Sequence, residues 1–298
     1  MKRPERVELC EVGPRDGFQF EEVFIPTRTK ISIIEKLIAS GLPRIQLTSF
    51  VHPRLVPQMA DAEEIVQTFL GRSGPVLSGL ALNAKGVERA AESGLTHVDV
   101  SIATNERHGR DNANMTVDEG IEQAERMLEI AAERNLHVQL GFQTVWGYAE
   151  PGDTPIETIV SLAERFGDRG LESLSLADST GLANPDAIRE TLSAVRDVTE
   201  TPLVLHLHDT RGLGIANIIA GVEAGVTRLD TSLGGLGGCP FIPGATGNVA
   251  TEDVIWALEE LGVETGVDAA TVAQASREVA QFLGRPLAGR LYALERRS

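Results

Sequence analysis

The sequence is poor in the residues that several classes of protein depend on. It contains only two cysteines, Cys10 and Cys239, and aromatic residues make up 4% of its 298 residues. Two cysteines cannot build the disulfide framework of a small secreted protein, and they suit a reducing compartment. So few aromatic side chains argue against a surface on which nucleic-acid bases stack.

Basic residues and long apolar runs are also scarce. The chain has 27 Lys and Arg against 43 Asp and Glu, which gives a net charge of −16. A surface this acidic argues against nucleic acid and anionic membranes as partners. No run of about 18 apolar residues occurs, so we expect no membrane-spanning helix. Residues 1–6 show neither an apolar signal core nor an acid-free transit segment, which leads us to expect a cytoplasmic protein.

Two phosphate-binding motifs are absent as well. A dinucleotide-binding sheet carries a glycine-rich turn after its first strand, but that position here reads Gly-Pro-Arg-Asp-Gly, residues 13–17. No Walker-type Gly-Lys-Ser/Thr loop is present. These absences disfavour an open doubly wound sheet, which is the alternative to the architecture considered next.

What the sequence does contain is a regular alternation of strand-like and helix-like segments. Short apolar segments bounded by turn residues predict strands, and apolar residues at helical spacing, such as Ile31, Ile34 and Ile38, predict helices. The predicted strands are 7–12, 44–49, 75–82, 96–102, 137–142, 172–177, 203–208 and 227–233. The predicted helices are 27–40, one from 61, 85–93, 116–134, 154–166, one from 184, 214–224, 251–261, 269–283 and a tail from 286.

Eight strands with helical connections predict an α/β protein whose parallel sheet closes into a (β/α)₈ TIM barrel. With 42% hydrophobic residues the chain can bury a large core. We therefore expect a single domain over residues 1–298, with a C-terminal helical extension from about residue 248. In such barrels the chemistry lies at the C-terminal ends of the strands.

Polar side chains gather at those predicted strand ends. His206 and His208 are two apart on the seventh strand, so they share a face and lie about 6.6 Å apart along it. That placement suits two imidazoles on one metal ion, although two histidines packed inside a barrel give the same pattern. With Asp16 and an amide oxygen they form a mixed O/N set. Such a set suits Mg²⁺ or Mn²⁺, or else Co²⁺ or Fe²⁺, better than structural Zn²⁺.

Other polar residues at these ends have two interpretations each. Arg15 beside Asp16 is either a functional cation or half of a weak exposed ion pair. Asp178 either faces the site or closes the turn of Asp-Ser-Thr-Gly. Cys239 is either an inert small hydrophobe or a thiol that its glycine-rich loop exposes enough to exchange protons. The remaining strand-end residues include Gln46, Ser49, Ser101, Gln143 and Ser175.

The remaining histidines and a charged segment receive plainer predictions. His52, His97, His108 and His137 are expected to be ordinary surface or loop residues. Arg107 and Arg110 belong to a charged run, 106–110, after the fourth strand. Such a run is most simply a solvated surface, and contact with the phosphates of a coenzyme is the alternative.

Several longer motifs resemble those of 3-hydroxy-3-methylglutaryl-CoA lyases, which belong to a superfamily of metal-dependent lyases and synthases on TIM barrels. The similarity extends from about residue 7 to about residue 265. The motifs are Glu-Val-Gly-Pro-Arg-Asp-Gly at 11–17, Thr-Ser-Phe-Val-His-Pro at 48–53, Val-Pro-Gln-Met-Ala-Asp at 56–61, His-Leu-His-Asp-Thr at 206–210, Gly-Leu-Gly-Gly-Cys-Pro at 235–240, and 244–253.

The resemblance implies a role for each matching residue. Arg15 would stabilise negative charge on the thioester oxygen, Cys239 would protonate the leaving carbon, and His206 or a metal-bound water would act as base. The implied metal ligands are Asp16, His206, His208 and Asn248. The implied substrate-binding residues are Gln19, Gln46, Ser49, Ser175 and Asp178.

The same resemblance implies an activity and partners. The protein would be a carbon–carbon lyase that uses a divalent metal to cleave a 3-hydroxy-3-methylglutaryl-CoA-like thioester to acetyl-CoA and acetoacetate. Its partners would be a small acyl-CoA substrate and further copies of itself, in a dimer or larger oligomer. The Gly-Gly-Cys-Pro loop favours a lyase over a condensing synthase.

Three departures from the family pattern keep alternatives open. Gln46 stands where the family usually has a glutamate, Glu22 stands where a basic residue is usual, and residues 143–148 lack the usual small Ser-Cys-Ala pattern. An amide accepts a hydrogen bond but carries no charge. The main alternative is therefore a related lyase or aldolase for another 3-hydroxyacyl-CoA or a 2-keto-hydroxy acid. A catalytically silent metal-binding homologue is a further alternative.

Overall fold

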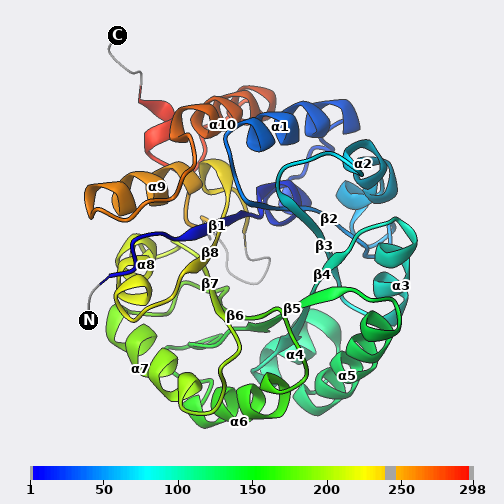
Figure 1. Cartoon of the computed structure of the whole chain (residues 1–298), viewed down its shortest axis with the longest axis vertical. Helices are drawn as coiled ribbons and strands as arrows, with labels where there is room; N and C mark the ends of the chain where they lie inside the picture. Colours follow the sequence, from blue (N-terminus) through cyan, green and yellow to red (C-terminus); the bar gives the residue numbers. More distant parts are fainter. Residues whose placement is uncertain (1–2, 239–245, 295–298) are drawn as a thin grey trace.

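Eight parallel strands close into a barrel in the computed structural model, which describes residues 3–238 and 246–294 (Figure 1). Each strand pairs with the next in the sequence, and β8 returns to β1, where Asp230 lies opposite Cys10. The strands are β1 (Glu8–Glu11), β2 (Arg44–Ser49), β3 (Val76–Ala81), β4 (His97–Ala103), β5 (His137–Gln143), β6 (Ser173–Asp178), β7 (Leu203–Leu207) and β8 (Arg228–Thr231). The predicted (β/α)₈ barrel is confirmed.

A ring of helices surrounds the barrel, and two further helices pack beside β1 and β8 (Figure 1). Each helix buries one apolar stripe; in α1, Ile33, Ile34 and Leu37 are almost inaccessible to solvent. The helices are α1 (Thr27–Ala39), α2 (Ala62–Phe69), α3 (Ala84–Glu92), α4 (Glu106–Ala113), α5 (Val117–Glu133), α6 (Ile156–Gly167), α7 (Pro185–Arg196), α8 (Gly214–Glu223), α9 (Thr251–Glu260) and α10 (Ala269–Leu283). In the described ranges, no helix is long and apolar enough to cross a membrane.

Two segments differ from the sequence-based prediction. The charged run after β4 forms helix α4, whose start is capped by the Asn105 side chain accepting from the backbone of Arg107 and His108 at 3.0 and 3.2 Å. Its sequence has no apolar periodicity, so the helix was not predicted. The helical tail predicted from Pro286 is wrong over residues 286–294, where only the short 3₁₀ turn Leu291–Ala293 forms.

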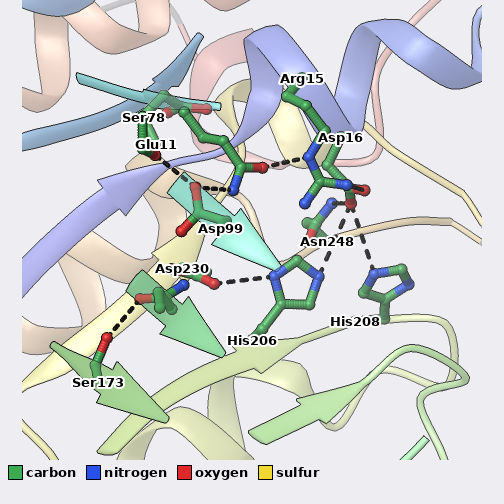
Figure 2. A network of polar contacts seen from close by, with 12 residues as sticks. Glu11, Arg15, Asp16, Ser78, Asp99, Ser173, His206, His208, Asp230 and Asn248 are labelled. Atoms are coloured by element: carbon green, nitrogen blue, oxygen red, sulfur yellow. Dashed lines mark hydrogen bonds and ion pairs between the residues drawn. The ribbon is translucent and has the colours of Figure 1, made fainter. Parts of the chain in front are cut away.

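The interior of the barrel is more polar than the packed apolar layers usual for this fold. Inside it, hydrogen bonds join Ser78 to Asp99 and Ser173 to Gln139, at 2.5 and 3.0 Å (Figure 2). The outward faces of the same strands carry apolar residues, such as Leu140 on β5, that pack against the helices. The fold therefore places its apolar core outside the barrel wall and a polar space inside it.

Candidate functional site

A cavity opens at the C-terminal ends of the strands and brings together most of the predicted site residues. Among the residues that line it are seven from the prediction: Arg15, Asp16, Gln19, Gln46, Ser175, His206 and His208. Residues that the prediction did not assign to the site also line it, including Asp99, Gln139 and Asp230. The cavity therefore lies where the sequence predicted the site, but more polar residues line it than were predicted.

A tight turn after β1 carries Arg15 and Asp16 over the cavity. Residues Gly13–Gly17 form a π-helical turn, and its start touches the loop after β8. A Cβ atom at Gly13 would lie 2.2 Å from Leu233 Cδ2 and 2.6 Å from Glu11 Oε1, so any side chain there would force both residues to move. The turn thus depends on close packing between the beginning and the end of the barrel.

Glu11 holds that junction together, although no sequence motif assigned it a role of its own. Its carboxylate accepts hydrogen bonds from the backbone of Gly13 and Leu233, both at 2.8 Å, and from the Thr251 hydroxyl at 2.7 Å. Burial raises the pKa of Glu11 to about 8, against the opposing effect of these three donors. The residue ties β1 to the loop after β8 and to α9.

Asp16, His206 and His208 form a compact cluster from two sides of the barrel (Figure 2). The Asp16 Oδ2 atom lies 3.8 Å from His206 Nε2 and 4.0 Å from His208 Nε2. Burial acts to raise the pKa of Asp16, but Arg15 and the two histidines hold it below its ordinary value. Burial and the neighbouring His206 lower the pKa of His208 to about 4. The cluster is therefore a carboxylate facing a neutral imidazole at His208.

Asn248 completes the cluster from the segment before α9. Its Nδ2 donates to Asp16 Oδ2 at 2.7 Å and to the Leu236 carbonyl at 3.0 Å. Its Oδ1 is buried and has no hydrogen-bond partner among the described residues. The backbone of Asn248 also bridges to that of His208. A buried amide oxygen without a hydrogen-bond partner, on a side chain that contacts Asp16, is available as a cation ligand.

These donors fit a divalent metal ion. Ligand atoms of Asp16, His206 and His208 all lie within 4.8 Å of one another. His206 Nδ1 lies 3.3 Å from Asp230 Oδ2, which leaves its Nε2 for the cluster, and this carboxylate–histidine pairing is common behind metal ligands. The chemistry of a carboxylate, an amide oxygen and imidazoles suits hard and borderline cations.

Arg15 is held at two points beside the cluster. Its Nε donates to Gln46 Oε1, and its Nη1 donates to Asp16 Oδ1. Gln19 Nε2 also donates to Asp16 Oδ1, at 3.2 Å. The Gln46 amide in turn donates to Asp99 Oδ2 at 2.6 Å. The sequence prediction missed Asp99, although it lies two residues before Ser101 on β4 and so shares that residue's face.

Two predicted substrate-binding residues are not brought to the cavity lining. Ser49 is buried at the end of β2, and its hydroxyl has no partner among the described residues. Asp178 accepts from the backbone of Leu182 and Ala183 at 2.9 and 3.0 Å, so its carboxylate closes the turn after β6. This geometry matches the turn interpretation of Asp178. The predicted thiol, Cys239, lies outside the described residues.

His108 is the clearest failure among the minor predictions. It was expected on the surface, but it is 5% exposed, lines the cavity from α4 and lies 5.1 Å, ring to ring, from Tyr148. Burial lowers its pKa to about 4. Arg107 and Arg110 on the same helix are exposed, as a solvated run would be. His52 is exposed, while His97 and His137 stack with ring centroids 4.6 Å apart.

Known proteins resemble the chain along almost its whole length. It is 36% identical over 291 residues to a hydroxymethylglutaryl-CoA lyase of Bacillus subtilis, covering 97% of each chain. It is 37% identical over 286 residues to a 3-hydroxy-3-isohexenylglutaryl-CoA/hydroxymethylglutaryl-CoA lyase of Pseudomonas aeruginosa, covering 96% of this chain and 95% of the relative.

A solved structure agrees with these sequences. An HMG-CoA lyase from Acinetobacter baumannii, in complex with coenzyme A and 3-methylmalate, superposes with a TM-score of 0.92 at 34% identity, covering 99% of this chain and 96% of that one. The sequence model of one family, described as HMGL-like, matches residues 6–279. With its closed barrel and its cluster of one acid and two histidines at the strand ends, the chain belongs to the HMGL-like family.

Proposed function

We propose that this protein is a carbon–carbon lyase that cleaves 3-hydroxy-3-methylglutaryl-CoA to acetyl-CoA and acetoacetate. The observation that carries the proposal is the cluster of Asp16, His206 and His208 beside Arg15, in a chain whose relatives are named for that activity. The Acinetobacter relative named with bound coenzyme A supports an acyl-CoA substrate.

The proposed metal site comprises Asp16, His206, His208 and Asn248. A divalent cation held there would supply positive charge that lowers the pKa of the substrate's tertiary hydroxyl. Asp16 enters the reaction as a carboxylate, and the Arg15 guanidinium beside it holds its pKa low. Asp230 orients the His206 ring through Nδ1. We propose Mg²⁺ or Mn²⁺ as the metal, since two of the four donors are oxygens.

The remaining residues have proposed roles in moving charge and a proton. The hydroxyl proton leaves, the C2–C3 bond breaks, and its electron pair becomes the enolate of acetyl-CoA. Arg15 stabilises the negative charge on the thioester oxygen, with a guanidinium already fixed by Gln46 and Asp16. Cys239 then donates a proton to the enolate carbon, which balances the proton lost from the hydroxyl. His206 can act as the base only while its Nε2 is not a metal ligand, because its Nδ1 is paired with Asp230.

The test of this function follows both products. Acetyl-CoA and acetoacetate are measured after adding 3-hydroxy-3-methylglutaryl-CoA to the protein with Mg²⁺ or Mn²⁺, and again with EDTA. We expect cleavage only with metal, and its collapse in Cys239→Ala protein that still binds metal. Folded, metal-loaded protein that releases neither product would contradict the proposal.

A second candidate is a related lyase that acts on another 3-hydroxyacyl-CoA. Gln46 favours it, because this residue touches Arg15 and stands where the family usually has an acid. The name of the Pseudomonas relative covers two acyl groups, of which one is much larger than methyl. A panel of thioesters that differ only at C3 separates the candidates. A larger kcat/KM for a substituent other than methyl would select the second.

Three further proposals concern the protein as a whole. We propose one domain over residues 1–298, a homo-oligomer of two or more chains, and a cytoplasmic location. The two cysteines, of which Cys10 is unpaired and buried, suit a reducing compartment. Light scattering of the purified chain gives its oligomeric state directly.

A further inference from the structure

Asp99 is a buried carboxylate without a role in the proposed reaction. It lies on β4, 6% exposed, and its Oδ2 accepts from the Ser78 hydroxyl at 2.5 Å and from Gln46 Nε2 at 2.6 Å. The oxygen of the same Gln46 amide accepts from Arg15 Nε, so Asp99 and Arg15 contact opposite ends of one amide. Gln46 therefore stands between a carboxylate and a guanidinium.

The amide of Gln46 joins those two groups in a fixed orientation. Its oxygen accepts from Arg15 Nε, and its nitrogen donates to Asp99 Oδ2. If the amide were rotated by 180°, its N–H groups would face the N–H of Arg15 and its oxygen would face the Asp99 carboxylate. Both hydrogen bonds would be lost, because an amide has one donor end and one acceptor end. Asp99 and Arg15 thus favour the same orientation of the amide, and Asp99 anchors the end that faces away from Arg15.

Arg15 needs this support because its chemistry depends on its orientation. The planar guanidinium carries donors in fixed directions. With Nε on Gln46 and Nη1 on Asp16, its Nη2 is the nitrogen without a hydrogen bond or ion pair to any residue that the structure describes. Arg15 lines the cavity, so Nη2 is available to a substrate oxygen there.

We propose that Asp99 is a positioning residue that holds the Arg15 guanidinium for the reaction through the Gln46 amide, and that residues 46 and 99 together require one carboxylate and one amide. The inference rests on the proposed function, because it concerns the same Arg15. A second carboxylate at position 46 would face Asp99 across 2.6 Å, where two like charges repel and only one ionises readily.

A double-mutant cycle tests the pair. Gln46→Glu should lower kcat at least roughly tenfold with little change in KM, because Arg15 acts on charge that develops in the transition state. Adding Asp99→Asn should restore most of the lost rate, since the carboxylate and the amide have then only exchanged places. Asp99→Asn alone should lower kcat, because the amide of Gln46 loses its anionic partner.

A matched control adds the same charge elsewhere in the cavity. Gln143 lines the cavity but donates to Ser101 Oγ, at 3.0 Å, instead of Asp99. Asp99→Asn should not restore the rate of Gln143→Glu protein. Mn²⁺ affinity, measured by calorimetry, should be the same in all five variants and the parent chain. If Gln46→Glu lowers kcat and weakens Mn²⁺ binding together, the proposal is overturned, because the substitution would then act on the metal ligands instead of on Arg15.

The remaining outcomes separate this proposal from the proposed function. Gln46→Glu protein as active as the parent, or a double variant no better than Gln46→Glu, overturns the positioning role. If the parent chain cleaves no thioester, the proposed function is rejected. The double-mutant cycle is then measured by the melting temperatures of the same variants. A loss of stability in Gln46→Glu that Asp99→Asn reverses supports the pairing, and additive losses overturn it.

Discussion

The two sides of the cavity are built on different principles. On the β7 side, His208 Nδ1 and Asn248 Oδ1 are buried without hydrogen-bond partners among the described residues. On the β2–β4 side, both ends of the Gln46 amide are paired and Asp99 Oδ2 accepts two hydrogen bonds. Unpaired buried polar atoms cost free energy, so they are expected where a group from outside the chain completes the site.

This difference separates two tasks. The β7 side offers buried atoms to a cation, whereas the Gln46–Asp99 pair on the β2–β4 side finds its partners within the chain and holds a positive charge in a fixed direction. Preorganised charge of this kind needs no rearrangement when the reaction begins. Changes on the two sides should therefore affect different measurements.

The largest effect is expected on the β7 side. His208→Ala removes one of the two imidazoles from the cluster and leaves Asp16 and His206. We expect Mn²⁺ affinity to fall at least roughly 100-fold, and cleavage activity to fall with it. Removing a residue that only hydrogen-bonds to a metal ligand already lowers metal affinity about 10- to 100-fold. Calorimetry and the product assay measure the two effects. Normal Mn²⁺ binding by this variant would place the metal elsewhere.

Arg15→Lys tests the opposite side with almost as large an effect. Lysine keeps the charge but cannot hold Gln46 and Asp16 through a planar fork. We expect kcat to fall roughly 100- to 1000-fold, as when one donor to a developing oxyanion is removed. Mn²⁺ affinity should stay within a few-fold of the parent value. Equal losses of metal affinity in Arg15→Lys and His208→Ala would erase the distinction between the sides.

Glu11 ties β1 to the loop after β8 and to α9, and its loss should affect stability first. Glu11→Ala leaves the backbone N–H groups of Gly13 and Leu233 buried without their acceptor. We expect the free energy of unfolding to fall by about 2–4 kcal/mol, measured by urea denaturation. Glu11→Gln, which keeps one acceptor oxygen, should lose less. A stable Glu11→Ala protein would show that the junction does not depend on this carboxylate.

The smallest effect concerns His108 at the cavity rim. Its folded pKa is about 4 against 6.5 for an ordinary histidine, so the unfolded chain binds its proton at higher pH than the folded one. The stability that the neutral ring contributes is complete above about pH 6.5 and is lost as the pH falls toward 4. Melting temperature should therefore decline less over this range in His108→Gln protein than in the parent.

A surface histidine provides the control for that comparison. His52 is exposed, so His52→Gln makes the same replacement without removing a buried ring. If the melting temperature depends on pH equally in His108→Gln protein and in the parent, burial does not lower the pKa of His108.

The sequence was most informative where one local pattern determines the geometry. His206 and His208 lie two apart on one strand, so the period of the strand alone predicts that they share a face. Strand and helix periodicity likewise predicted the barrel, and its closure is confirmed. Helix α4 was missed because a side-chain cap, and not an apolar stripe, marks its start.

The sequence was least informative where a role depends on a partner from a distant strand. Gln46 stood out as a departure from its family, but its hydrogen bond to Asp99 crosses 53 positions of sequence. His108 was predicted on the surface because its neighbours in the sequence are charged. Its burial results from tertiary packing, which the local sequence does not show. Asp178 fitted two roles until its backbone partners were known.

The most direct test of the account is a titration of Mn²⁺ into EDTA-treated protein, with metal binding and acetyl-CoA release from 3-hydroxy-3-methylglutaryl-CoA followed together. The account predicts no release without metal and two curves that saturate at the same Mn²⁺ concentration. Release that does not depend on metal, or metal binding at the cluster without release of acetyl-CoA, would contradict it.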